Sequence, residues 1–322
     1  MIDSEALSYF KEWIIINIVK IADINSGILA DKEEFIRESE EKYKKEIENA
    51  AKRILDNSSE KPIVLVSGPS GSGKTTSAGR VEKILRENGC GAYTISMDNY
   101  FLPDNCGVEF PRNPDGTIDL ESPYRLDIPL LQKHLDMLND GTPIDSPIFN
   151  FKTRDRDGSI HIERKKGDVI ILEGIHALNP EVTGESKNYA TCIYVSVRTR
   201  IENSQNDRLH PRLIRLLRRL GRDKLYRGRD MRETFDMFKS VSRGEETYIM
   251  PYKKLADFDI DTFIPFEPAI YRWAVYDDLK RMKEEMLGDF DYDIILSFLD
   301  ELEAVDRVNV PSDSLIREFV GE

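Results

Sequence analysis

The chain has 322 residues, of which 33% are charged and 40% are hydrophobic, and its formal net charge is −13. A chain of this length can bury a full core, as one large domain or as one domain with an appendage. The acidic balance argues against nucleic acid or an anionic membrane as the main partner. Any basic patch therefore needs a local explanation.

The cysteines and the first residues indicate a cytoplasmic protein. Three cysteines are scattered without metal-ligand spacing, which is typical of a reducing compartment and not of a disulfide framework. The apolar run at residues 14–19 is too short to span a bilayer, and the residues before it are acidic where a signal peptide would be basic. We expect no membrane partner.

Residues 1–57 predict an N-terminal helical hairpin. Apolar side chains recur at helical spacing over residues 4–24, and a narrow apolar stripe runs through a highly charged segment at residues 31–55. Gly27 lies between them as the expected stop. The hairpin either packs on the domain that follows or serves as a dimerisation arm. The sequence leaves both alternatives open, so a homo-oligomer is possible.

Residues 62–76 combine a short apolar strand with a phosphate-binding loop. The spacing Gly68-x-x-x-x-Gly73-Lys74-Thr75 is the P-loop pattern. Its glycines let backbone N–H groups point at phosphate oxygens, Lys74 supplies a cation, and Thr75 offers a hydroxyl to Mg²⁺. A helix is expected next, with its positive end facing the anion. The expected nucleotide-binding residues are Gly68, Ser70, Gly71, Ser72, Gly73, Lys74, Thr75 and Thr76.

Strands and helices alternate beyond this loop, which predicts an α/β fold with a parallel sheet flanked by helices. A hairpin is expected to turn at Asp157-Gly158. A loop at residues 103–123, rich in Pro, Gly and Asn, is too long for a plain connector and is a candidate substrate loop. The other expected strands cover residues 92–97, 169–172, 192–197 and 261–264, and the expected helices cover residues 126–138, 231–246, 268–287 and 291–305.

Two carboxylates follow apolar strands, at the edge where ligands bind to a parallel sheet. Glu173 comes directly after one strand, where a carboxylate can steady a Mg²⁺ shell or cap a loop. Asp98 ends another strand and is the candidate base, since a carboxylate can orient an acceptor hydroxyl and take its proton. From spacing alone, a loop-capping role suits Asp98 equally well.

Eight arginines between residues 208 and 229 make this segment of the acidic chain locally basic. Such a helical segment is usually a solvated face, but arginine also suits bidentate contact with phosphate. We favour a mobile arginine-rich lid over ATP at residues 203–230, with RNA binding as a weaker alternative because no aromatic residues are interleaved. The arginines are Arg208, Arg212, Arg215, Arg218, Arg219, Arg222, Arg227 and Arg229.

A guanine-reading Asn/Thr-Lys-x-Asp motif would be expected in a GTPase, and the sequence contains none. This favours a transferase over a GTP switch.

The ordered motifs make the chain resemble the uridine kinase and phosphoribulokinase family of P-loop kinases over residues 61–267. Only the P-loop is specific by itself, but the ordered set is specific. The other motifs are Ser96-Met-Asp-Asn-Tyr-Phe101, Glu121-Ser-Pro-Tyr-Arg-Leu-Asp127, Pro147-Ile-Phe-Asn-Phe151, Glu173-Gly-Ile175, the run from Arg218 to Asp230, and Lys253-Lys-Leu-Ala-Asp257.

The resemblance implies roles for individual residues. Asp98 would be the catalytic base, assisted by Lys74, Arg219 and Arg222, and Thr75 with Glu173 would serve Mg²⁺. Arg222 would also contact ATP. The residues implied in substrate binding are Asp98, Tyr100, Glu121, Phe149, Arg154, Arg219, Arg227 and Arg229.

The chain departs from the family where the acceptor is recognised. The stretch that usually reads Phe-Asp-His-Pro-Asp-Ala-Phe-Asp is Leu120-Glu-Ser-Pro-Tyr-Arg-Leu-Asp127 here. Phe149 takes the place of a tyrosine, Arg154 of a histidine, and Met237 falls near a glutamine that contacts the pyrimidine. The resemblance therefore leaves the acceptor open.

We accordingly expect an ATP- and Mg²⁺-dependent kinase that phosphorylates a small molecule, with the 5′-hydroxyl of a nucleoside as the leading acceptor. A sugar, sugar phosphate or polyol is the alternative, which Arg154 would suit if the acceptor is anionic. A nucleotide-gated regulatory or RNA-binding protein is the alternative of another class. The expected parts are an N-terminal helical extension (1–57), a P-loop kinase domain (58–267) and C-terminal helices packed on it (268–322).

Overall fold

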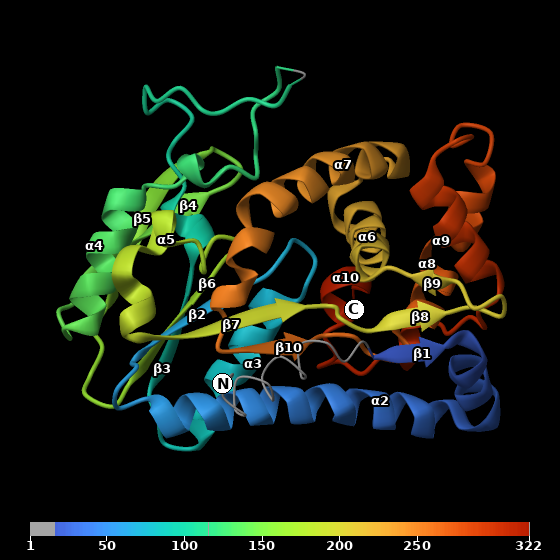
Figure 1. The fold of residues 1–322 in the computed structure, drawn as a ribbon, viewed down its shortest axis with the longest axis horizontal. Helices are drawn as coiled ribbons and strands as arrows, with labels where there is room; N and C mark the ends of the chain where they lie inside the picture. The colour runs from blue at the N-terminus through green and yellow to red at the C-terminus, as the bar shows by residue number, and fades with distance from the viewer. Residues whose placement is uncertain (1–16, 115, 322) are drawn as a thin grey trace, which may run out of the picture. The chain divides into compact units, whose positions relative to one another are not determined.

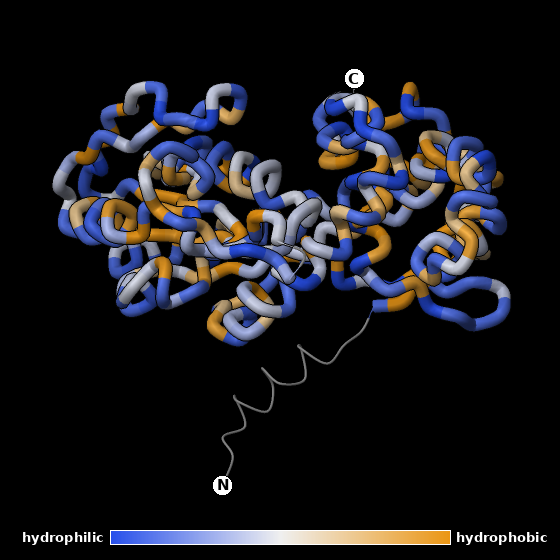
Figure 2. Tube along the Cα trace, turned by 90° about the horizontal axis from the view of Figure 1, so that it is seen from above, coloured by the Kyte–Doolittle hydropathy of each residue, from blue (hydrophilic) through white to orange (hydrophobic). Residues whose placement is uncertain are grey.

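A computed structural model describes residues 17–114 and 116–321 of the chain (Figure 1). The chain forms two compact units, each with hydrophobic segments gathered inside (Figure 2). We call residues 42–196 with 228–262 the sheet unit, and the described parts of residues 1–41, 197–227 and 263–322 the helical unit. This division differs from the three consecutive ranges expected from the sequence, because residues 197–227 join the C-terminal helices.

A five-stranded parallel sheet forms the centre of the sheet unit, with the strand order β10-β7-β2-β6-β3. Every residue of β2, β6 and β7 is buried, as in sheets that are covered on both faces. The predicted α/β class with a parallel sheet is therefore confirmed. The strands are β2 (Ile63–Ser67), β3 (Ala92–Ser96), β6 (Val169–Glu173), β7 (Ala190–Ser196) and β10 (Phe258–Asp261).

Helices pack against this sheet. In Figure 1, α3 lies on one side of the sheet, and α4 and α5 lie on the other. The second half of α2 joins the sheet unit, where the Tyr43 and Ser77 hydroxyls are hydrogen-bonded at 2.8 Å. Besides this half of α2, the helices of the sheet unit are α3 (Lys74–Glu87), α4 (Ile128–Asn139), α5 (Pro180–Thr183) and α7 (Met231–Tyr248).

The predicted hairpin forms, but its turn was placed wrongly. Strands β4 (Ile144–Asn150) and β5 (Asp155–Ile162) pair antiparallel, so Asp157 and Gly158 lie inside β5. The chain reverses instead at residues 151–154, where the Asn150 side-chain oxygen accepts hydrogen bonds from the N–H groups of Lys152 and Thr153. An asparagine side chain that bonds the backbone ahead of it stabilises such a turn.

The N-terminal region also differs from the prediction. Most of the expected first helix lies outside the described residues, and its last part contains a strand, β1 (Ile18–Lys20), which pairs with β8. The helix α2 (Ile21–Asn57) runs through Gly27, whose missing side chain leaves room for the Phe35 ring. The break falls at Asp31, which accepts a capping bond from the Glu34 N–H at 3.0 Å.

The helical unit contains a small three-stranded sheet and four helices besides the start of α2. In the sheet unit, strand β10 ends at Asp261, whereas the sequence predicted a strand at residues 261–264. No helix in the described ranges is long and apolar enough to cross a membrane. The remaining elements are β8 (Arg200–Glu202), β9 (Arg208–Leu209), α6 (Pro211–Arg222), α8 (Glu267–Arg281), α9 (Phe290–Asp300) and α10 (Arg317–Val320).

Candidate active site

The P-loop joins β2 to α3 and has the backbone that the glycine pattern predicts. Gly71 and Gly73 have φ angles of 72° and 83°, which other residues rarely adopt. Gly68 packs so closely that a Cβ atom there would lie 1.9 Å from the Val195 carbonyl oxygen. The loop is therefore held against the end of β7 by backbone contact, and it presents the first N–H groups of α3 as an anion cradle.

The eight nucleotide-binding residues predicted from the P-loop pattern lie in this loop and the first turn of α3, whereas Arg222, the ninth, lies in α6. The Lys74 ammonium donates to the Pro69 carbonyl at 3.1 Å, so the side chain folds back over the loop. Thr75 is exposed at the start of α3, where its hydroxyl is open to a metal ion or a phosphate group. These residues fit a nucleoside triphosphate with its Mg²⁺.

Asp98 and Glu173 are brought together by neighbouring strands. In the parallel pairing of β3 with β6, Ser96 lies opposite Glu173, and Asp98 follows two residues later in a short 3₁₀ segment. Gly174 allows this approach, because a Cβ atom there would lie 2.5 Å from the Met97 Cβ. The predicted base and the predicted metal ligand thus share one edge of the sheet.

The surroundings of Asp98 favour proton transfer. Asp98 is exposed to solvent on one side, yet protein surrounds its carboxylate closely on the others. Desolvation and, to a smaller extent, the charge of Glu173 raise the pKa of Asp98 to about 6, although the charge of Lys74 opposes both. A carboxylate with this pKa is ionised at neutral pH and is a stronger proton acceptor than an ordinary aspartate.

Aromatic side chains gather beside Asp98. The Phe149 ring is edge-on to Phe101 and to Phe151, with centroids 5.7 and 5.2 Å away, and Phe151 is 62% exposed. The Asn99 side chain accepts a hydrogen bond from the Phe149 N–H at 3.2 Å, which ties the hairpin to the segment after β3. Phe101 and Phe151 were missed as candidates, although both stand in the quoted motifs.

Tyr100 lies apart from this aromatic group. Its ring is buried, and its hydroxyl is hydrogen-bonded to His134 Nδ1 of α4 at 2.9 Å. Burial raises the pKa of Tyr100 to about 12. Its role in acceptor binding stays a prediction, while its visible role is to fix the segment that carries Asp98.

Two further residues predicted to bind the acceptor are Arg154, which contacts the predicted substrate loop, and Glu121, which belongs to it. Arg154 is exposed and pairs with Asp104 of that loop at 3.0 Å. Arg125 approaches the same carboxylate at 3.7 Å and lies over the Phe101 ring at 5.2 Å. Glu121 is partly exposed, and its N–H donates to Asp119 Oδ1 at 3.1 Å. Arg154 and Arg125 therefore share the single carboxylate of Asp104.

Of the four arginines predicted to contact ATP or the acceptor, three belong to the helical unit, where each has an acidic partner. Arg219 and Arg227 approach the buried Asp223 at 3.5 and 3.1 Å, and Arg222 lies 3.8 Å from Glu318. Arg229 belongs to the sheet unit. Within the segment expected to be a mobile lid, α6 is largely buried, whereas residues 204–208 and 224–228 are exposed. The lid and the part of these arginines in the reaction stay proposals.

Thr262 is a site residue that the sequence did not indicate. It is fully buried beyond β10, and its hydroxyl donates to the Ser72 carbonyl of the P-loop at 2.7 Å. The two residues are 190 positions apart, so no local pattern could reveal the contact.

Replacing Thr262 with valine is expected to weaken ATP binding about 10-fold, because the Ser72 carbonyl loses a buried donor. Equilibrium titration with ATP measures the effect. Thr191→Val is the matched control, since Thr191 is equally buried and its hydroxyl has no hydrogen-bond partner among the described residues. Equal losses in both variants would show that Thr262 acts only through packing.

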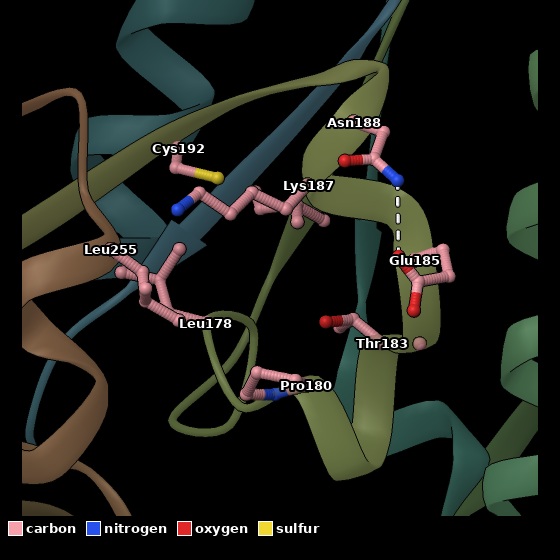
Figure 3. A pocket seen from close by; sticks show the side chains of 10 residues that line it. Leu178, Pro180, Thr183, Glu185, Lys187, Asn188, Cys192 and Leu255 are labelled. Carbon is pink, nitrogen blue, oxygen red and sulfur yellow. Dashed lines mark hydrogen bonds between the residues drawn. The ribbon is translucent and has the colours of Figure 1, made fainter.

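A pocket of about 210 Å³ lies elsewhere in the sheet unit (Figure 3). Leu65 and Cys192 of adjacent strands line it with Leu178 and Leu255, and the Lys187 amine points toward the Cys192 sulfur (Figure 3). Burial raises the pKa of Cys192 to about 12, so its thiol is unreactive at neutral pH. No predicted site residue lines this pocket, and we do not include it in the site.

Comparisons with known proteins agree with the geometry. A model of the phosphoribulokinase/uridine kinase family matches residues 63–264. The chain is 31% identical over 201 residues to a uridine kinase from Lactobacillus helveticus, an overlap of 62% of this chain and 85% of that relative. It is 30% identical over 212 residues to a uridine kinase from Deinococcus deserti, an overlap of 65% and 92%.

Among solved structures, a possible uridine kinase from Bacillus stearothermophilus aligns with a TM-score of 0.44 at 19% identity. The alignment covers 68% of this chain and 98% of that one. This likeness is too distant to support an assignment.

Proposed function

Because the chain belongs to the phosphoribulokinase/uridine kinase family, we propose that it phosphorylates the 5′-hydroxyl of a nucleoside such as uridine or cytidine. Membership makes it an ATP-dependent phosphotransferase that acts on an alcohol group of a small molecule. The observation that carries our proposal is Asp98, poised beside Glu173 and the P-loop with a raised pKa. The exposed face of Phe151 supports a nucleoside, because a flat base can stack on it.

The reaction follows from these positions. The acceptor oxygen bonds to the γ-phosphorus, the bond to the β–γ bridging oxygen breaks, and ADP leaves. Asp98 takes the hydroxyl proton, and the P-loop N–H groups with Lys74 hold the charge that builds up on the phosphate oxygens. The hydrogen bond from the Phe149 N–H to the Asn99 side chain keeps the aromatic group attached to the segment that carries Asp98.

We propose that Thr75 and Glu173 hold Mg²⁺, which when bound neutralises phosphate charge. The described residues contain no cluster of three or more His, Cys, Asp or Glu side chains that could hold a metal. Sparse protein ligands suit Mg²⁺, which keeps waters and shares its shell with substrate phosphates. For Arg219, Arg222, Arg227 and Arg229, the proposed contact with phosphates and acceptor rests on their place in the family motif.

The pH profile tests Asp98 as the base. Because the ionised carboxylate is the active form, kcat/KM should fall as the pH drops through the pKa of Asp98. Bound Mg²⁺ would lower this pKa, so the acidic limb is expected between the ordinary value of 3.8 and about 6. Steady-state kinetics at saturating ATP measure it. An acidic limb centred above pH 7 would point to another group.

Two rival functions predict different partners. A sugar, sugar phosphate or polyol acceptor would use Arg154, which in this structure pairs with Asp104 of the predicted substrate loop. RNA binding through the arginine run is opposed by the acidic partners of Arg219, Arg222 and Arg227. We place the protein in the cytoplasm, without a nucleic-acid or membrane partner.

An ADP-release screen over nucleosides, sugars, sugar phosphates and polyols separates these functions. Our proposal predicts ADP release that depends on uridine or cytidine. Release only with sugars or polyols would support the first rival, and salt-sensitive RNA binding without release would support the second.

A further inference from the structure

His176 links three separate segments of the sheet unit. It lies three residues after Glu173 and is only 3% exposed. The imidazole lies within hydrogen-bonding reach of backbone groups of Glu121, in the predicted substrate loop, and of Tyr248, at the end of α7. Its ring also lies edge-on to the Tyr248 ring, with centroids 6.2 Å apart. One side chain thus joins the end of β6 to the loop and to α7.

One polar atom of His176 is in an unfavourable environment. Its Nδ1 atom is buried and has no hydrogen-bond partner within residues 17–114 and 116–321. An unsatisfied buried polar atom is unfavourable, so a leucine would suit the cavity better if packing alone mattered. Burial lowers the pKa of His176 to about 4, so the ring is neutral at physiological pH and has one N–H to donate. We assign that N–H to Nε2, facing the backbone groups.

The last turns of α7 make further contacts with the same loop. The Tyr248 hydroxyl donates to Asp119 Oδ2 at 3.0 Å, and Arg243 Nη2 donates to Asn113 Oδ1 at 2.6 Å. Gly244 lies against Glu121, and a Cβ atom there would come within 2.3 Å of the Glu121 Cβ. Contacts to residues 113, 119 and 121 therefore all come from one face of α7.

We propose that His176 and Tyr248 latch the predicted substrate loop to α7, and that this latch positions Glu121 for acceptor binding. Ordering a long irregular loop costs conformational entropy, which a binding site must recover through specific contacts. His176 and Tyr248 are positioning residues, because they act through the loop backbone and Asp119. The role of Glu121 rests on the proposed function, whereas the latch itself does not.

Amide hydrogen exchange of the free protein tests the latch. In His176→Leu and Tyr248→Phe, exchange over residues 116–123 should rise about 10-fold, the equivalent of one lost hydrogen bond. Tyr189→Phe is the matched control, because its hydroxyl donates to Asp136 of α4 at 2.8 Å, away from the loop. An unchanged loop in both latch variants, or an equal rise throughout β2 and β6, would overturn the proposal.

Kinetics then test the link to the acceptor, with uridine as the probe. The latch variants should raise KM for uridine about 10-fold and leave KM for ATP within about twofold. His176→Asn should restore part of the uridine affinity, because its amide can donate to the same backbone groups. A parallel rise of both KM values would overturn the positioning role. If the unmodified protein does not phosphorylate uridine, the proposed function fails while the exchange result still decides the latch.

Discussion

Replacing Asp98 with asparagine is expected to lower turnover by about 10²- to 10⁴-fold, the usual contribution of a positioned general base. Asparagine keeps the size of the side chain and can still accept a hydrogen bond, but it cannot take the proton. ATP affinity should stay the same or increase slightly, because removing a negative charge beside Lys74 does not weaken phosphate binding. Single-turnover phosphorylation and ATP titration measure the two effects separately.

Asp145→Asn serves as the control for this variant. Asp145 is an exposed aspartate of the β4–β5 hairpin and pairs with His161 at 3.0 Å, outside the proposed site. Its turnover should remain close to that of the unmodified protein. Near-normal turnover of Asp98→Asn would show that the base is misassigned, whereas loss of ATP binding would indicate damage to the P-loop.

The second large effect is expected in the helical unit, where Arg218 and Glu267 form a fully buried ion pair. Both side chains are 0% exposed, and Arg218 Nη2 donates to Glu267 Oε2 at 2.9 Å. The Tyr271 hydroxyl donates to the same carboxylate, and the guanidinium lies 4.9 Å from the centroid of the Phe319 ring. Although burial opposes the charge, Glu267 raises the pKa of Arg218 above its usual value.

Arg218→Met should destabilise the helical unit by about 3–5 kcal/mol, because it leaves the Glu267 carboxylate buried without this cation. Chemical unfolding followed by hydrogen exchange in α6 and α8 measures the loss. The double variant Arg218→Met/Glu267→Leu should recover most of the stability, since well-packed apolar side chains replace both charges.

Arg212→Met is the matched control for the buried pair. Arg212 makes two hydrogen bonds to Asp291, at 2.8 and 2.6 Å, but both side chains are partly exposed. The expected loss is at most about 1 kcal/mol. Equal losses at positions 212 and 218, or a double variant no more stable than the single one, would contradict this account of the buried pair.

The sequence could predict the parts of the site that follow from local order along the chain. Gly68 follows β2 directly, Asp98 lies two residues beyond β3, and Glu173 is the last residue of β6. The carboxyl ends of parallel strands meet at one edge of the sheet. Their proximity therefore followed from the alternation of strands and helices. The P-loop glycines likewise predicted a backbone that only glycine adopts easily.

Features that depend on contacts between distant segments could not be predicted this way. Residues 18–20 form a strand because they pair with β8, which overrides their helical periodicity. Thr262 reaches Ser72, and His176 reaches Glu121 and Tyr248, across long stretches of chain. Tyr100 stands beside Asp98 in sequence, but its short 3₁₀ segment directs the phenol into the core.

The identity of the phosphorylated product tests the central proposal most directly. The protein, ATP, Mg²⁺ and uridine would be incubated together, and the products followed by phosphorus NMR. We predict uridine 5′-monophosphate and ADP in equal amounts, both formed about 10²- to 10⁴-fold more slowly by Asp98→Asn. No uridine product, together with rapid ADP formation from a sugar or polyol, would contradict the assignment of a nucleoside as acceptor.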